Sequence, residues 1–306
     1  MRPLLTVPAL VLAISPLGAG LSAQSAPILV TTDWLASHLT DPGLVVLHVS
    51  AQRSDYDAGH IPGARWLSWQ SIAHQRDGLS TELPEAAALD SILESLGVSD
   101  GSRIVITGGP ITMTARSYFT LDYFGLGDRT SLLDGGIDAW REEARAVERT
   151  APTVARGTLT LRPQPGKLAD ARWISTQAAP PSGATPIAVL DARAPEFFAG
   201  LASTNNPRPG RLPMAVGNVP FTWVTGEFAR YRDRDRLAQL FTRAGVKPGN
   251  KVVTYCHIGM QASVLYVAAR LLGYDAAVYD GSFEDWSKRT DLPVTGPSGP
   301  PKPPQS

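Results

Sequence analysis

The sequence predicts an α/β protein of two tandem domains, each built on a mostly parallel sheet flanked by helices. Three observations predict this class. The chain has 306 residues, which is about twice the length of an average domain. Three motifs of the first half recur in the same order in the second half. Within each half, short apolar runs alternate with stretches of helical periodicity, as expected where helices connect parallel strands.

The internal repeat places the domain boundaries. The offset between matching segments drifts from 139 to 148 and back to 146 residues, as insertions and deletions in loops would produce. We expect a first domain at 27–150, a proline-containing linker at 151–166 and a second domain at 167–293. The matching segments are Ile28–Leu35 with Lys167–Ile174, Leu96–Ile106 with Ala244–Thr254, and Leu133–Trp140 with Tyr279–Trp286.

The two ends of the chain are expected to lie outside the fold. Residues 1–26 have a positive start, an apolar stretch and then small residues, which is typical of a secretory signal peptide. Pro8 and Pro16 leave fewer than the roughly 18 uninterrupted apolar residues of a spanning helix, so no stable membrane anchor is expected. The mature protein is therefore predicted to be periplasmic or secreted. Residues 294–306 are rich in glycine and proline and are predicted to be a disordered tail.

The apolar pattern predicts individual strands and helices. Leu44–Leu47 and Ile187–Leu190 are short apolar runs, which are typical of buried parallel strands. Pro84 begins a stretch whose apolar residues follow the helical spacing i, i+3, i+4, i+7, and Leu237–Ala244 repeats that spacing. Each predicted helix leads into another apolar, strand-like run.

Composition and charge exclude several classes of protein. The 28 basic and 28 acidic residues cancel, whereas proteins that bind nucleic acid irrespective of sequence carry a basic excess, so no nucleic-acid partner is expected. A single cysteine excludes an intrachain disulfide and Cys-rich zinc folds. The five histidines lack metal-ligand spacing and no glycine-rich phosphate loop occurs, so we expect neither a metal nor a cofactor.

Cys256, the only cysteine, follows the predicted strand Lys251–Tyr255 and precedes an apolar helix that ends at Gly273. Ligands of parallel α/β sheets bind at the carboxyl ends of the strands. Unpaired N–H groups at the start of a helix stabilise an anion, so the pattern predicts a lowered pKa for the Cys256 thiol. Gly259 lets the loop curl around the sulfur. The alternative is an inert buried cysteine. A lone thiol at a ligand-binding position of an exported protein favours the functional role.

Together these motifs resemble the tandem-domain rhodanese family, the thiosulfate and 3-mercaptopyruvate sulfurtransferases. The resemblance covers residues 27–293 and implies two rhodanese-like domains. It implies that Cys256 takes up a sulfane sulfur as a persulfide. The sulfur then passes to a thiophilic acceptor such as cyanide or a thiol, including the thiol of a partner protein. Cys256–Gln261 resembles the family's six-residue active loop. The motifs are Asp57–Ala64, Leu190–Arg193 with Glu196–Phe197, Cys256–Ala262 and Tyr279–Trp286.

The loop and the resemblance also predict the residues that bind substrate. The backbone N–H groups of the loop are expected to hold the persulfide and the departing charge. Arg193 and Arg211 are candidates for binding an anionic substrate, and an ion pair of Arg193 with Asp191 or Glu196 is the alternative. The predicted substrate-binding residues are His257, Ile258, Gly259, Met260, Gln261, Ala262, Arg193 and Arg211.

Three residues near these motifs have simpler assignments. His257 is expected to point outward rather than to act as a base, because a thiolate stabilised by amides needs no base. Asp280 is assigned to a turn and Trp286 to the core.

The first domain is expected to be catalytically silent. Its segment Gly108–Thr114 falls opposite the Cys256 loop and contains no thiol, and His48 falls opposite Asp191. The expected role of this domain is to cover one side of the active-site cleft.

The sequence leaves the donor and some rival functions open. The loop lacks both the Arg and Lys of many thiosulfate enzymes and the Gly-Ser-Gly of many mercaptopyruvate enzymes. Thiosulfate is preferred because an exported protein meets inorganic sulfur compounds, and 3-mercaptopyruvate is the alternative. A phosphatase is disfavoured because no arginine that could clamp phosphate occurs between the loop and Arg270. A non-turnover sulfur carrier or redox-sensing thiol protein is the non-enzymatic alternative.

Overall fold

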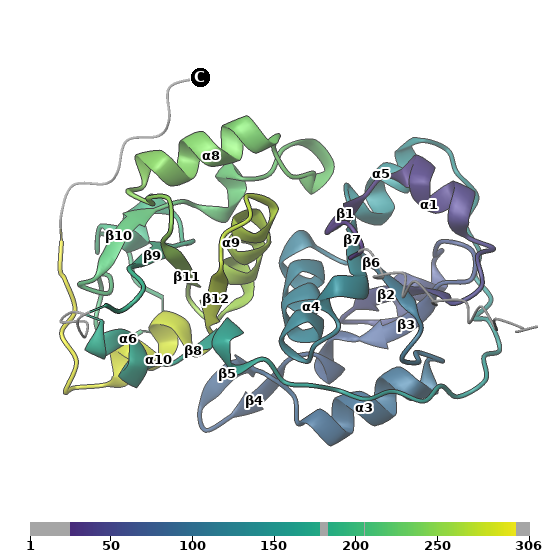
Figure 1. Cartoon of the computed structure of the whole chain (residues 1–306), viewed down its shortest axis with the longest axis horizontal. Coiled ribbons are helices and arrows are strands. Elements are labelled where there is room, and N and C mark those ends of the chain that lie inside the picture. Colours follow the sequence, from purple (N-terminus) through teal and green to yellow (C-terminus); the bar gives the residue numbers. More distant parts are fainter. Residues whose placement is uncertain (1–24, 178–182, 205, 298–306) are drawn as a thin grey trace, which may run out of the picture.

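The computed structural model describes residues 25–177, 183–204 and 206–297, which form two five-stranded parallel sheets side by side (Figure 1). The first sheet has the strand order β1-β7-β6-β2-β3 and the second has the order β8-β12-β11-β9-β10. Each strand of one sheet corresponds to its repeat partner in the other, so the predicted fold class and the duplication are confirmed.

The strands and helices follow the predicted alternation. The first sheet contains β1 (Leu29–Val30), β2 (Leu44–Ser50), β3 (Arg65–Ser68), β6 (Arg103–Gly108) and β7 (Thr130–Leu133). The second contains β8 (Leu168–Ala169), β9 (Ile187–Asp191), β10 (Ala215–Asn218), β11 (Lys251–Tyr255) and β12 (Ala276–Tyr279). A hairpin of β4 (His74–Arg76) and β5 (Leu79–Glu82) extends from the first domain.

Among the residues that the structure describes, five α-helices belong to each half of the repeat. The first half has α1 (Thr32–His38), α2 (Arg53–Asp57), α3 (Ala86–Ser95), α4 (Ile111–Tyr123) and α5 (Gly136–Glu142). The second half has α6 (Ala171–Thr176), α7 (Pro195–Phe198), α8 (Arg234–Arg243), α9 (Met260–Leu271) and α10 (Ser282–Lys288). Short 3-10 turns are η1 (Trp69–Ser71), η2 (Gly127–Arg129), η3 (Pro165–Lys167), η4 (Phe221–Trp223) and η5 (Glu227–Ala229).

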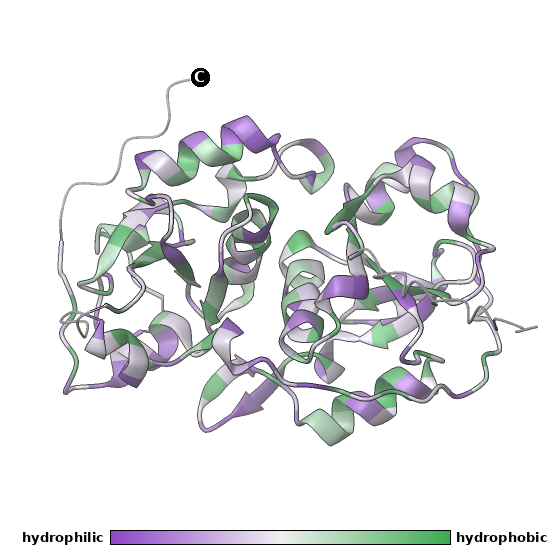
Figure 2. Cartoon of the chain, in the orientation of Figure 1, coloured by the Kyte–Doolittle hydropathy of each residue, from purple (hydrophilic) through white to green (hydrophobic). Residues whose placement is uncertain are grey.

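The apolar patterns explain which faces are buried. The apolar runs of β2 and β9 are buried in the centres of their sheets. In α3, Leu89 and Leu93 face the core, and Leu237 and Leu240 do the same in α8. Figure 2 shows α8 divided into an apolar and a polar face, as expected for a helix that covers a sheet from the solvent side.

Helices α4 and α9 pack against each other between the two sheets (Figure 1). Residues 262–269 of α9 are all buried, because this helix contacts its own sheet on one side and α4 on the other. The rings of Phe119 in α4 and Tyr266 in α9 meet edge to face, with centroids 5.2 Å apart. One continuous hydrophobic cluster therefore joins the two domains.

A buried carboxylate ties this interface together. Asp122, near the end of α4, is almost fully buried and pairs with Lys167 and with Arg270 of α9. Tyr266 donates a hydrogen bond to the same carboxylate at 2.5 Å. Burial, and then the charge of Asp122, raise the pKa of Tyr266 well above its usual value, so its hydroxyl stays a donor.

The segments outside the two sheets differ partly from expectation. The linker region 151–166 lies along the first domain, where Gly157 N–H donates to the Glu94 carbonyl at 2.8 Å. Thr295, which the sequence places in the tail, instead exchanges two backbone hydrogen bonds of 3.0 Å with Arg211. The predicted signal peptide up to residue 24 and the tail beyond residue 297 lie outside the described residues. Within the described segments, no helix is long and apolar enough to cross a membrane.

Replacing Asp122 with asparagine should destabilise the protein. Lys167 and Arg270, each about three-quarters buried, would keep their charges without the carboxylate that compensates them. We expect a loss of about 2–3 kcal/mol in the free energy of unfolding, measured by urea denaturation. The exposed Asp41→Asn is the control, with an expected change below about 0.5 kcal/mol. Equal stability of the two variants would contradict the role given to Asp122.

Candidate functional site

Cys256 lies where the sequence predicts it, directly after β11 and before α9. Its side chain is completely buried. Its N–H donates to Ser282 Oγ at 3.2 Å, and its carbonyl accepts from Phe283 N at 3.0 Å. The segment after β12 therefore holds the main chain of the cysteine in place.

The loop from Cys256 to Gly259 curls back onto its own sulfur. Gly259 N–H donates to Cys256 Sγ at 3.2 Å. Hydrogen bonding by the backbone N–H groups of Ala262, Ile258 and Gln261 also lowers the pKa of the thiol. Gly259 has φ +89°, a conformation that side chains rarely adopt. A Cβ atom there would also lie 2.8 Å from Arg116 Nη1 and 2.9 Å from the Asp280 carbonyl oxygen. Position 259 thus requires glycine, because other residues disfavour this backbone conformation and no room remains for a Cβ atom.

The predicted lowering of the Cys256 pKa is wrong for this buried thiol. Burial raises the pKa of the Cys256 thiol, although hydrogen bonds from the backbone amides lower it. Desolvation of a fully buried anion here outweighs the amides. The sequence shows the helix start but not how deeply the sulfur is buried, and that depth decides the sign.

His257 is half-buried rather than directed outward. Its ring meets the ring of Phe197 edge to face, with centroids 4.6 Å apart. Burial, and then the charge of Arg193, lower the pKa of His257 to about 4, so the imidazole is neutral near pH 7. Within the described residues its Nδ1 is buried and has no hydrogen-bond partner.

Arg193 forms the ion pair that was the alternative to substrate binding. Its guanidinium holds both oxygens of Asp191, with distances from 2.6 to 3.1 Å, and also donates to the Gly210 carbonyl at 2.8 Å. It stacks over the ring of Phe283 at 4.1 Å. Arg211 is partly exposed and lies over Phe198, to whose carbonyl it donates at 3.3 Å.

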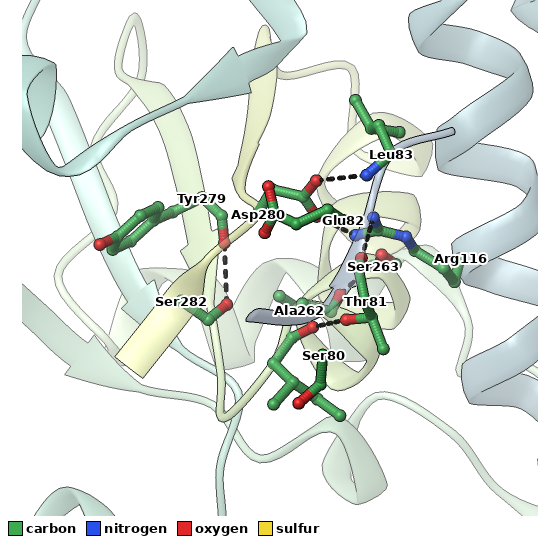
Figure 3. Close-up of polar contacts among 12 residues, drawn as sticks. Ser80, Thr81, Glu82, Leu83, Arg116, Ala262, Ser263, Tyr279, Asp280 and Ser282 are labelled. Carbon is green, nitrogen blue, oxygen red and sulfur yellow. Dashed lines mark hydrogen bonds and ion pairs between the residues drawn. The ribbon is translucent and has the colours of Figure 1, made fainter. Parts of the chain in front are cut away.

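The first domain, which was expected to cover one side of the cleft, contributes individual side chains to the loop's surroundings that the sequence did not single out. Thr81 of β5 donates from its hydroxyl to the Ile258 carbonyl (Figure 3). Arg116 of α4 forms a buried ion pair with Asp280 and also donates to the Thr81 carbonyl at 2.5 Å. Leu83 N–H donates to the second oxygen of Asp280 at 3.0 Å.

Asp280 is therefore more than the turn residue that its motif suggested, whereas Trp286 lies in the core as expected. The only sequence signal for this cluster is an arginine, Arg116, inside the apolar helical segment that becomes α4. Glu82 also faces the cluster. Burial and the neighbouring Asp280 raise the pKa of Glu82 to about 7.

The corresponding loop of the first domain encloses a small cavity. This cavity of about 210 Å³ lies over Gly108–Ile111 and is covered by Phe228 and Ala229 of the second domain. His48 occupies the strand position equivalent to Asp191, and burial lowers its pKa to about 4. No cysteine occurs in this half of the sequence, so the cavity has no thiol nucleophile. Across the described ranges, no group of three or more His, Cys, Asp or Glu residues could hold a metal.

Comparisons with known proteins agree with this geometry. The Rhodanese-like domain matches residues 31–143 and 176–289. A putative thiosulfate sulfurtransferase, SseA, of Mycobacterium tuberculosis is 31% identical over 290 residues, covering 90% of this chain and 93% of the relative. One from Saccharopolyspora erythraea is 28% identical, covering 88% and 96%.

Two solved structures are similar in fold. SseA from Escherichia coli, solved in work on 3-mercaptopyruvate sulfotransferases, has a TM-score of 0.73 at 23% identity, covering 84% of this chain and 99% of that one. An anaerobic ergothioneine biosynthesis enzyme from Chlorobium limicola has a TM-score of 0.78 at 18% identity, covering 89% and 71%. At these identities the likeness concerns the fold alone.

Gly259→Ala should cost more stability than Gly273→Ala. Both glycines have φ +89°, but nothing lies within 4 Å of a Cβ at Gly273. We expect a loss of about 1 kcal/mol for Gly273→Ala from backbone strain, and about 3 kcal/mol for Gly259→Ala, which also displaces the buried Arg116. Chemical denaturation measures both. Equal losses would show that the loop is not packed against the first domain as described.

The reactivity of Cys256 should rise continuously with pH. The thiolate is the reactive form, and a raised pKa means that its fraction still increases at pH 9. The rate of alkylation by iodoacetamide, measured from pH 6 to 10 with Cys256→Ser as the blank, should show no plateau below pH 9. A plateau near pH 7 would show that the backbone amides outweigh burial and that the pKa of Cys256 is lowered, as the sequence predicted.

Proposed function

The chain belongs to the rhodanese-like domain family, and on that premise we propose that it is a sulfurtransferase that moves a sulfane sulfur from thiosulfate, through a Cys256 persulfide, to a thiophilic acceptor. The observation that carries the proposal is the lone buried thiol with the Gly259 N–H 3.2 Å from its sulfur. The mycobacterial and Saccharopolyspora relatives, which are named as putative thiosulfate sulfurtransferases, support thiosulfate as the donor.

The reaction consists of two displacements at sulfur. The Cys256 thiolate attacks the outer sulfur of thiosulfate, the S–S bond of the donor breaks, and sulfite leaves with the bonding electron pair. Cyanide or a thiolate then attacks the outer sulfur of the persulfide, and the Cys256 thiolate leaves. No external oxidant or reductant is needed. The negative charge stays on sulfur throughout, where the loop's N–H groups stabilise it.

Burial of the sulfur protects the proposed persulfide from side reactions, although it makes the free thiol harder to ionise. A persulfide exposed to water would meet competing nucleophiles and oxidants, whereas a closed loop excludes them. Residues His257 to Ala262 supply main-chain N–H groups, so this proposal requires their backbone and not their side chains. The imidazole of His257 is neutral near pH 7, so it supplies no positive charge to attract an anionic sulfur donor.

The binding of an anionic donor by Arg193 and Arg211 stays a prediction. Asp191 and Gly210 occupy the inward N–H groups of Arg193, so its charge is already compensated. Arg211 is partly exposed and donates to the Phe198 carbonyl, and its contact with the oxyanion end of a donor is likewise a prediction. A periplasmic or secreted location, supported by the signal-like residues 1–26, is also part of the proposal, and it would admit protein thiols as acceptors.

A 3-mercaptopyruvate sulfurtransferase is the second candidate. The cysteine loop carries neither donor's usual residues, and the fold is shared with Escherichia coli SseA, whose structure was solved in work on 3-mercaptopyruvate sulfotransferases, so this donor is tested beside thiosulfate. Both candidates use the same Cys256 persulfide and differ only in the group that leaves.

Steady-state thiocyanate formation from cyanide tests the proposal. We expect turnover with thiosulfate, a smaller rate with 3-mercaptopyruvate, and a loss of at least about 10³-fold in Cys256→Ser, since nothing else in the chain can carry the sulfur as a persulfide. A higher rate with 3-mercaptopyruvate would select the second candidate. A folded protein that takes up one sulfur but never turns over would instead be a carrier.

A further inference from the structure

The peptide unit between Ile258 and Gly259 is held at both ends. Its N–H, from Gly259, donates to Cys256 Sγ at 3.2 Å. Its carbonyl, from Ile258, accepts from the hydroxyl of Thr81 in the first domain. In a planar trans peptide the C=O and N–H bonds point in opposite directions, so fixing the oxygen also fixes the direction of the N–H.

We propose that Thr81 is a positioning residue for the sulfur site: its hydroxyl orients the Ile258–Gly259 peptide so that the N–H faces the sulfur of Cys256. The proposal rests on the proposed function, in which Cys256 carries the transferred sulfur. Thr81 touches neither the sulfur nor a substrate in this role. It acts through one peptide of the other domain.

The loop needs such an anchor because its glycine makes the peptide easy to rotate. Gly259 is in the left-handed region at φ +89°, and glycine enters several backbone regions with little cost. A rotation of the preceding peptide would turn the Ile258 carbonyl toward the sulfur and the Gly259 N–H away from it. An anionic sulfur would then face an oxygen in place of a donor.

Thr81 is itself fixed by the cluster in Figure 3, where its side chain lies next to the loop that precedes α9. It is almost fully buried, and its own carbonyl accepts from Arg116 Nη2 at 2.5 Å. The other end of the Arg116 guanidinium pairs with Asp280, which also accepts from Leu83 N–H at 3.0 Å. The residues on both sides of Thr81 thus bind the second domain, Ser80 through Glu284 and Leu83 through Asp280.

The hydrogen bond to the Ile258 carbonyl has a second effect. A peptide whose oxygen accepts a hydrogen bond becomes a better donor at its N–H, because the two groups polarise each other. The groups that act on the Cys256 thiol are the amides of the loop, and burial opposes them. The Gly259 amide, whose carbonyl partner Thr81 holds, is one of the four loop amides that lower the pKa of the thiol, after those of Ala262 and Ile258.

Ser80 provides a matched control on the same strand. It also contacts the second domain, donating from its main chain and its hydroxyl to Glu284 at 2.9 and 3.1 Å. Glu284 belongs to α10 and not to the cysteine loop. Ser80→Ala removes one hydroxyl contact between the domains without touching the Ile258–Gly259 peptide.

The test compares Thr81→Val, Thr81→Ser and Ser80→Ala in the full chain, using the pH profile of Cys256 alkylation by iodoacetamide. In Thr81→Val the thiolate loses part of one charge-assisted hydrogen bond, so the profile should move upward by about one pH unit and the rate at pH 8 should fall about tenfold. Thr81→Ser keeps the hydroxyl and should stay within about twofold of the native protein, as should Ser80→Ala.

Three outcomes decide the proposal. A native rate in Thr81→Val would overturn it, as would equal slowing in Thr81→Val and Ser80→Ala, which would indicate general loosening of the domain interface. A faster rate would also overturn it, because a loop that merely opened would expose the thiol. Thr81→Ala replaces Thr81→Val if the valine variant does not fold, as judged by its melting temperature.

Alkylation requires no sulfur donor, so the proposed function is judged separately. If the native protein shows no thiocyanate turnover but Thr81→Val still slows alkylation, the sulfurtransferase proposal fails while the positioning role stands. If turnover is normal and Thr81→Val has no effect on alkylation, only the positioning role fails.

Discussion

The complete burial of the Cys256 sulfur is the constraint on which the rest of this structure depends. Cys256 has no solvent contact, and burial raises its pKa. The stabilisation available comes from backbone N–H groups, of which Gly259 N–H is 3.2 Å from the sulfur. These groups act only while the loop keeps its curled shape, so every contact that fixes the loop also affects the chemistry of the thiol.

Both domains contribute residues beside the other domain's loop. The β5 strand of the first domain contacts the cysteine loop through Thr81, whereas Phe228 and Ala229 of the second domain line the cavity next to Gly108–Ile111. A first domain without a cysteine can still be required, because it supplies Thr81 and the Arg116 partner of Asp280.

Local patterns in the sequence predicted much of this arrangement. The repeat, the apolar runs that became β2 and β9, and the position of Cys256 between β11 and α9 all follow from neighbours along the chain. Contacts between distant residues could not be predicted in this way. Arg116 and Asp280 are 164 positions apart, and no periodicity links them. The sign of the Cys256 pKa shift was wrong for the same reason, since burial depends on how the two domains pack.

The intact mass of the protein, measured before and after exposure to thiosulfate and then to cyanide, tests the central claim most directly. The single cysteine makes the result unambiguous. We predict that thiosulfate adds the mass of one sulfur atom, that cyanide removes it, and that Cys256→Ser shows neither change. A protein whose mass is unchanged by thiosulfate and by 3-mercaptopyruvate alike, or a Cys256→Ser variant that still gains sulfur, would contradict the account.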